Sequence, residues 1–291
     1  MKRVQVGSVA ATAVKLTFAA VVTLAASLPA AAADMPAPAA TARTSYLTSA
    51  PASEWTVTIG IEGRVLPKFE GASASMLRPF PILRVRKANE PDQFRSARDG
   101  LSFAIVDAGA FKLGPVAKLR FGRKESDDNN LRGLGDVNWT LEAGAFAELW
   151  PSDWLRTRVE VRQGFGGHHG VVADLMLDGI YKATPQLTLS AGPRLTVGTA
   201  ASTSPYFSIT AAQAALSGLP VYDARGGVRS YGAGTQATYA FNRQWSGEVF
   251  LEYERLAGDA ANSPLVVQRG SRDQLQVGMV VTYSFNMPGL W

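Results

Sequence analysis

The sequence contains no cysteine and only two histidines. Without cysteine, disulfide frameworks, thiolate metal sites and cysteine nucleophiles are excluded. The histidines, His168 and His169, are adjacent, and adjacent side chains on an extended backbone point in opposite directions, so they do not chelate one ion together. We therefore interpret GFGGHHG, the stretch that holds them, as a solvated loop and expect no metal site.

Sequence motifs of common enzyme classes are absent as well. GxxxxGK[ST] and HExxH do not occur, and no GxGxxG follows a strand and opens a helix. Two serines stand out, Ser217 in LSGLP and Ser263 in ANSPL, but neither lies in a GxSxG elbow. Tight turns beside Gly218 and Pro264 explain both serines. We predict a protein that is not an enzyme and that needs no cofactor.

An export signal accounts for much of the positive charge. Three basic residues precede the apolar run LTFAAVVTLAASLPA, and a small-residue A-x-A site follows it. This pattern predicts a signal peptide over residues 1–33, cleaved between Ala33 and Asp34, and a flexible leader over residues 34–54. Removal of the signal lowers the formal net charge from +5 to +2, so no nucleic-acid partner is expected. No later stretch reaches about 18 uncharged apolar residues, so we expect no transmembrane helix.

Strict alternation of apolar and polar residues recurs along the rest of the chain, for example in WTVTIGIEGRV, DVNWTLEAGAFAEL, QLTLSAGPRLTV and DQLQVGMVVTYSF. Such segments are strands with one apolar and one polar face. Several reach or exceed the roughly 9–11 residues that a tilted strand needs to cross a bilayer. Strands in lipid must close on themselves to satisfy their backbone. The pattern predicts an all-β, transmembrane antiparallel β-barrel over residues 55–285, with the apolar face on lipid and the polar face inside.

The links between these segments indicate the number of strands. Short links occur at 87–93, 107–110, 150–154, 183–186 and 242–244, and longer polar links at 66–77, 123–136, 197–228 and 256–272. Two further outer links are the RDG stretch at 98–100 and GFGGHHG at 164–170. Outer-membrane barrels have short periplasmic turns and longer outer loops. Alternation of the two kinds gives about twelve strands with both termini in the periplasm, or ten if residues 93–107 form one bent strand.

Charged residues on the polar face predict ion pairs inside the barrel. A turn centred on the serine of WPSDW pairs residues whose numbers sum to 304. Glu148 then faces Arg156 and Glu142 faces Arg162, whereas a tighter register would oppose two glutamates, which is destabilising. We predict a lumen crossed by Glu–Arg pairs that narrow or plug it.

The stretch DQLQVGMVVTYSF has the features of a closing strand that pairs with the first strand near residues 55–65. Aromatic residues at its end, Tyr283 and Phe285, match the signal that outer-membrane assembly machinery reads. Because NMPGLW follows, either Phe285 is the signal and residues 286–291 are a periplasmic tail, or Trp291 supplies the terminal aromatic. We favour Phe285, where the alternation stops.

Several longer pieces resemble the MltA-interacting protein (MipA)/OmpV family of bacterial outer-membrane proteins. They are PFPIL, FGRKESDD with LRGLGD, PYFSITAAQAALSGLPVYDARGG, LAGDAANSPLV and the closing YSF, within about residues 55–285. The resemblance implies a barrel in the outer membrane of a Gram-negative bacterium. It also implies a scaffold role in the cell envelope, linking a murein synthase to a lytic transglycosylase of the peptidoglycan machinery. Other members are discussed as porin-like proteins, antigens or adhesins, so the alternatives are a narrow channel for small solutes and a surface adhesin.

Two outer links carry further expectations. The charged link GRKESDDNNLRG is either a hydrated loop or a contact for lipopolysaccharide phosphates through Arg123, Lys124 and Arg132. The link 197–228 is too long to be idle and contains the apolar pieces YFSI and AAQAALSGLPVY. We expect it to fold into the barrel mouth as a plug or to form a partner surface. Ser202, Thr203 and Ser204, just before the Tyr-Phe pair, replace the acidic residues expected in the family, so no ion-related role is transferred to them.

Overall fold

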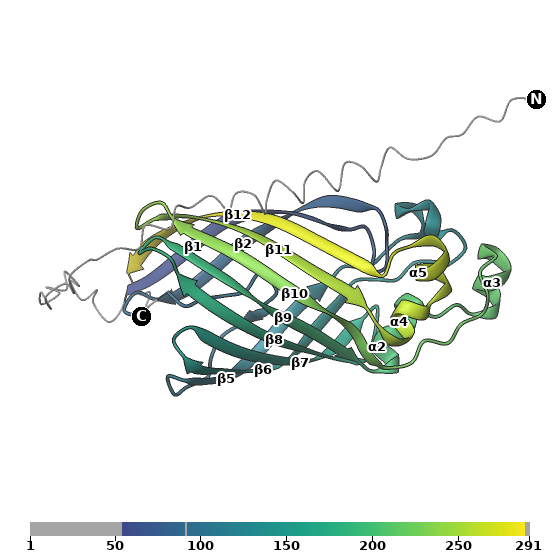
Figure 1. Cartoon of the computed structure of the whole chain (residues 1–291), viewed down its shortest axis with the longest axis horizontal. Helices are drawn as coiled ribbons and strands as arrows, with labels where there is room; N and C mark the ends of the chain where they lie inside the picture. Colours follow the sequence, from purple (N-terminus) through teal and green to yellow (C-terminus); the bar gives the residue numbers. More distant parts are fainter. Residues whose placement is uncertain (1–53, 91, 289–291) are drawn as a thin grey trace, which may run out of the picture. The chain divides into compact units, whose positions relative to one another are not determined.

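A computed structural model describes residues 54–90 and 92–288, which form one curled antiparallel sheet (Figure 1). Its order is β2-β1-β12-β11-β10-β9-β8-β7-β6-β5-β3, with β4 also on β5. The all-β antiparallel architecture is confirmed. The predicted signal peptide and its cleavage site lie outside the described residues. The strands are β1 Glu54–Pro67, β2 Ser75–Lys87, β3 Leu101–Ser102, β4 Val106–Asp107, β5 Phe111–Arg120, β6 Thr140–Ser152, β7 Leu155–Gly166, β8 Val171–Lys182, β9 Leu187–Gly198, β10 Gly227–Ala240, β11 Trp245–Leu256 and β12 Asp273–Pro288.

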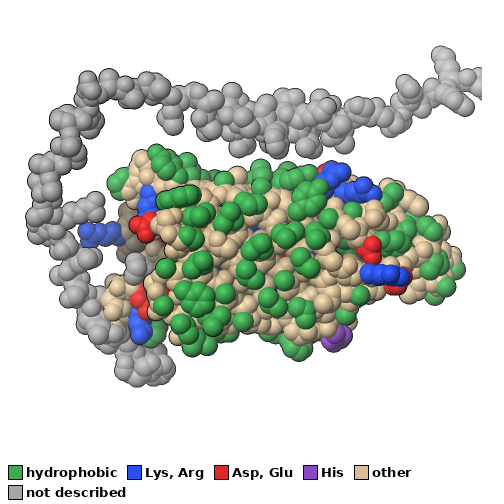
Figure 2. Space-filling model, turned by 60° about the horizontal axis from the view of Figure 1, so that its bottom comes forward, with side chains coloured by type: hydrophobic (Ala, Val, Ile, Leu, Met, Phe, Trp, Pro, Cys, Tyr) green, Lys and Arg blue, Asp and Glu red, His purple; other side chains and the backbone are tan. Residues whose placement is uncertain are grey.

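Alternation along the strands turns apolar side chains outward and polar ones inward. On β2, Leu77 and Leu83 are 69% and 63% exposed, whereas the residues that follow them, Arg78 and Arg84, are half-buried. Figure 2 shows apolar side chains over the middle of one face, with charged side chains toward its two ends. This distribution is typical of a barrel wall in contact with lipid. In the described part of the chain, no helix is long and apolar enough to span a membrane.

The described residues contain the expected twelve strands, but β3 and β4 are only two residues long each. The reason lies in residues 92–100, which follow β2 and turn into the interior; we call them the inner strap. The RDG stretch, expected as an outer link, is part of this strap. Its Gly100 amide donates to Glu160 over 3.0 Å. The long strands expected on both sides of RDG are therefore absent from the described residues. The inner strap and the two short strands β3 and β4 take their place.

The hydrogen-bonded ladder of the described sheet does not close between its ends. There β2 lies beside β5 through side chains: the rings of Phe80 and Phe121 are 5.6 Å apart, and the Arg78 guanidinium lies 4.3 Å from the Phe121 ring. Pro79 and Pro81 of β2 have no amide hydrogen, so this strand has fewer donors than a regular barrel strand. We call this line the β2–β5 seam.

The long links at one end pack into a cap, shown at the end away from the C-terminus in Figure 1. Its buried apolar side chains form two clusters, around Leu131 and Leu265 and around Phe207. The long link 197–228 folds into this cap. The helices of the cap are η1 Glu125–Asp127, η2 Asn129–Leu131, α2 Ala200–Phe207, α3 Ala211–Ser217, α4 Gly258–Asn262 and α5 Pro264–Arg269.

The register of β6 and β7 differs from the predicted one by two residues. Glu148 is paired with Arg158, and Gly144 with Arg162, so the paired numbers sum to 306 instead of 304. The physical reason is the turn: β6 continues through Ser152, and its pairing with β7 shifts between Leu149 and Ser152. A shift of two residues leaves every side chain on its original face.

The last strand pairs with the first as predicted. In this ladder Tyr283 is opposite Ile59 and Phe285 is opposite Val57. However, β12 does not end at Phe285, because Met287 and Pro288 still pair with β1. Three residues of the predicted tail over 286–291 thus belong to the closing strand.

Candidate functional site

The interior of the sheet is filled by buried arginines and carboxylates. Arg162 of β7 contacts three carboxylates: Nε lies 3.0 Å from Glu142, Nη1 lies 2.5 Å from Glu160, and Nη2 lies 2.6 Å from Asp174. All four side chains are almost completely buried. The structure thus brings together Glu142 and Arg162, which the sequence pattern pairs.

Arg156, which lies near the start of β7 beside the short turn, repeats this arrangement. Its guanidinium lies 2.7 Å from Asp99, 2.8 Å from Glu148 and 3.0 Å from Asp178. The sequence pattern pairs it with Glu148, and the two are in contact here. Glu148 also contacts Arg158 at 3.0 Å, which links this cluster to its neighbours. A continuous network of buried ion pairs therefore crosses the interior from β6 to β8.

The inner strap is fastened to the network by charges and by its backbone. Arg98 pairs with Asp174 at 3.1 Å and also with Glu254 on the opposite wall. The Ala97 amide donates to the Gln236 side chain over 3.0 Å. Arg194 donates to a strap side chain, the hydroxyl of Ser96, over 3.2 Å. Because these contacts come from widely separated strands, the strap spans the interior and divides it into two chambers.

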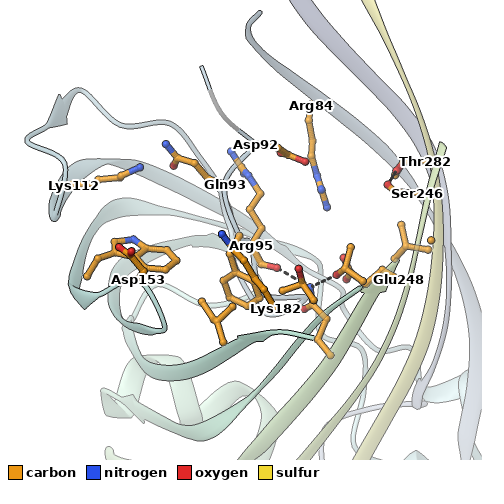
Figure 3. Close-up of a pocket in the computed structure, with 18 of the residues that line it drawn as sticks. Arg84, Asp92, Gln93, Arg95, Lys112, Asp153, Lys182, Ser246, Glu248 and Thr282 are labelled. Atoms are coloured by element: carbon orange, nitrogen blue, oxygen red, sulfur yellow. Dashed lines mark hydrogen bonds between the residues drawn. The ribbon is translucent and has the colours of Figure 1, made fainter. Parts of the chain in front are cut away.

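The first chamber lies on the side of the short turns and has a volume of about 500 Å³. We call it the turn-side chamber. Figure 3 shows charged side chains from β2, the strap, β8 and β11 around one hollow. Positive charge is supplied there by Arg84, Arg95, Lys112 and Lys182, and negative charge by Asp92, Asp153 and Glu248. The chamber is suited to charged or strongly polar molecules.

The second chamber lies under the cap and has a volume of about 270 Å³. Glu70, in the link between β1 and β2, accepts from Arg229 over 2.6 Å and from Arg120 over 3.0 Å. Burial opposes ionisation of Glu70, but the charges of Arg229 and Arg120 outweigh it and hold its pKa below the ordinary value. This carboxylate fixes the link against β5 and β10 and so holds the cap in place.

The sequence reasoning places one of the two histidines wrongly. His168 is not part of a solvated loop, because it is only 1% exposed, whereas His169 is exposed. Its Nδ1 accepts from the Gly170 amide over 3.3 Å, so Nε2 donates to Glu142 over 3.1 Å. A side chain at Gly164 would collide with the imidazole, since its Cβ would lie 2.2 Å from a ring carbon. The abundance of glycine around the histidines is the sequence signal for this packing.

The other candidate residues occupy structural positions. Ser263 is fully buried and donates to the Phe207 carbonyl over 2.7 Å. Arg123 is buried as well, and burial lowers its pKa to about 10 while its Nη1 donates to the Tyr206 carbonyl over 2.9 Å. Of the three basic residues weighed for contact with lipopolysaccharide, Arg123 is therefore not accessible, whereas Lys124 and Arg132 are exposed. In residues 54–90 and 92–288, no group of three or more potential ligands is arranged to hold a metal ion.

The apolar outer face, the inward polar face and the short turns at one end define the class of an outer-membrane β-barrel protein. The family model "MltA-interacting protein MipA" matches residues 59–285, and the chain belongs to this family. Its location in the outer membrane of a Gram-negative bacterium is as predicted. No curated protein sequence matches the chain.

Solved structures of outer-membrane proteins have a related architecture. An outer membrane channel from Pseudomonas putida F1 is similar at 11% identity and a TM-score of 0.42, over 81% of this chain and 97% of that chain. The outer membrane channel DcaP of Acinetobacter baumannii is similar at 9% identity and a TM-score of 0.35, over 81% and 99%. OmpT of Vibrio cholerae is similar at 9% identity and a TM-score of 0.35, over 80% and 98%.

Proposed function

We propose that the protein is a scaffold of the cell envelope that binds enzymes of murein metabolism at its periplasmic end. The observation that carries this proposal is the network of buried ion pairs that crosses the interior. Buried ion pairs around Arg156 and Arg162 join neighbouring strands, and the inner strap ties them to the opposite wall. Charge-assisted hydrogen bonds between neighbouring strands are strong and hold the strands that they join in place. A fixed barrel with a cap over its outer end suits an anchoring role better than free diffusion of solutes.

The family name supports the nature of the partner, because it is that of a protein that interacts with MltA. The periplasmic end offers the turn-side chamber and exposed charged residues at its rim, such as Asp153 and Lys182. These are surfaces to which a periplasmic protein has access. A lytic transglycosylase and a murein synthase are the partners that we propose.

Site-specific photo-crosslinking in intact envelopes tests the scaffold. A photoreactive residue at Lys182, on the turn side, should trap a murein enzyme that mass spectrometry identifies. The matched control places the same residue at Lys124, an exposed position of the cap. Trapping of murein enzymes at both positions alike, or at neither, would contradict a specific periplasmic docking site.

A narrow channel is the second candidate function. The observation in its favour is a third cavity at the β2–β5 seam, which shares Arg84 and Glu248 with the turn-side chamber and Arg64 and Phe80 with the chamber under the cap. Single-protein recordings in planar bilayers separate the two functions. Steady open-channel currents support the channel, and a silent bilayer with correctly folded protein supports the scaffold.

A further inference from the structure

The cavity at the seam crosses the wall of the barrel. Its volume is about 380 Å³, and its lining comes from β2, the inner strap, β3 and β5, with inward side chains of β1, β11 and β12 at the back. The outer part of the lining is apolar and faces lipid, with Leu83, Leu101 and Leu119 at 63%, 72% and 50% exposure. The inner part is charged and includes Arg84 and Arg95. One continuous space therefore runs from an apolar mouth to a charged interior.

In the described part of the chain, the barrel wall has no backbone hydrogen bonds along the β2–β5 seam, where only side chains connect the two strands. Among residues 54–90 and 92–288, β2 pairs only with β1, and no strand pairing joins it to β3 or β5. The inward side chains of β2 reflect this, since Phe80, Ile82 and Arg84 are only half-buried. On β7, within the continuous sheet, the inward Arg156 and Arg162 are 1% exposed. Parting of β2 and β5 breaks side-chain contacts and leaves the ladders of the sheet intact.

The charges inside the cavity favour an anion. Within the part of the chain that the structure describes, no carboxylate lies within 4.0 Å of the guanidinium groups of Arg84 and Arg95. Other charged groups of the lining already have ion-pair partners, because Arg64 pairs with Glu62 and Asp99 pairs with Arg156.

Arg84, Arg95 and Glu248 are then the charged groups of the lining that have no ion-pair partner among the described residues. Two positive charges and one negative charge leave one excess positive charge. Removal of an unpaired charge from water is costly, and a guanidinium binds carboxylates with two parallel hydrogen bonds. These charges select a ligand with a single anionic group.

We propose that the seam admits a long-chain carboxylate from the membrane. The acyl chain lies between β2 and β5, and the carboxylate binds Arg84 and Arg95. Both arginines also line the turn-side chamber, so the head group meets water on the periplasmic side. The apolar mouth, the cationic interior and the open ladder each fit one part of such a molecule. This lipid-binding role is separate from the scaffold function and does not depend on it.

Spin-labelled stearate provides a direct test, with the full mature protein in phosphatidylcholine nanodiscs. We expect a motionally restricted component in its spectrum that the analogue with a trimethylammonium head group does not give. Unlabelled palmitate should displace the label. Equal restriction of the two head groups would overturn the proposal without the need for any variant, because the charge argument would then be wrong.

Variants locate the site. Arg84→Gln with Arg95→Gln should weaken stearate binding by at least about tenfold, since each lost charge-assisted contact is worth roughly a factor of ten. Arg86→Gln on the same strand does not line the seam cavity and should bind as the native protein does. Ala117→Trp should block the mouth, and Ala147→Trp, on the outer face of β6, is its matched control. Heat-modified mobility on gels verifies folding. Unchanged binding in folded Ala117→Trp protein would refute entry at the seam.

Discussion

Replacement of Arg162 by methionine should lower the free energy of unfolding by about 3–5 kcal/mol, the usual cost of removing one partner from a buried ion pair. The side chain is 1% exposed and contacts Glu142, Glu160 and Asp174. Methionine fills much of the same space and adapts to irregular surroundings, so the loss is mainly electrostatic. The cost arises because three carboxylates stay buried after their shared cation is removed.

The remaining partners limit this cost. Glu142 keeps Arg120 at 2.7 Å, and Glu160 keeps Arg158 at 2.9 Å. Asp174 likewise keeps Arg98 at 3.1 Å. No carboxylate becomes isolated, so we do not expect three separate penalties to add. Contacts within one network are not additive in general.

The assay is denaturant unfolding of the protein in phosphatidylcholine vesicles, followed by tryptophan fluorescence. The six tryptophans of the sequence provide the signal. Arg243→Met, in an exposed turn, is the matched control and should change stability by less than about 0.5 kcal/mol. A loss below about 1 kcal/mol for Arg162→Met, with an unchanged slope, would refute the view that the network stabilises the barrel.

Three further predictions concern the cap and the closing strand. The pKa of Glu70 lies below its ordinary value of 4.5, so the ionised carboxylate stabilises the fold above that pH, and this effect is lost as the pH falls. The difference in stability between the native protein and Glu70→Gln should therefore shrink in acid. Unfolding at about pH 7 and about pH 3 measures this difference. Phe207→Ala should cost about 3–5 kcal/mol and speed proteolysis within residues 197–228, and equal cleavage rates would contradict its role in the cap. Deletion of residues 286–291 should leave assembly in cells intact, as judged by heat-modified mobility, whereas Phe285→Ala should impair it; the opposite result would assign the assembly signal to the tail.

The sequence predicts the parts of this fold that depend on local periodicity. Alternation over residues 273–285 identifies the closing strand, and the short turns at 107–110, 150–154, 183–186 and 242–244 lie where the links predict them. The fifth predicted short turn, 87–93, is wrong, because the chain after β2 continues into the inner strap. The region of residues 88–110 is different, because its structure depends on partners far away in the sequence. Arg98 and Asp99 are charges that a surface loop would expose to water, and only the folded barrel supplies Asp174 and Arg156 to pair with them. The two prolines of PFPIL, Pro79 and Pro81, are the one local signal that β2 is not a regular inner strand.

The ion pairs show which property of a strand a sequence determines most reliably. Glu142 and Arg162 are in contact although the predicted register is wrong, because they meet diagonally and not directly across the ladder. Diagonal neighbours on one face lie about 7–8 Å apart, a distance that arginine spans. Gly144 and Gly164 stand opposite the two charged residues, so no side chain blocks the diagonal. A two-residue slip therefore preserves the pairing, whereas a one-residue slip would place every charge in lipid. The polar network depends on the face that a residue occupies, and this face is what the period of two specifies.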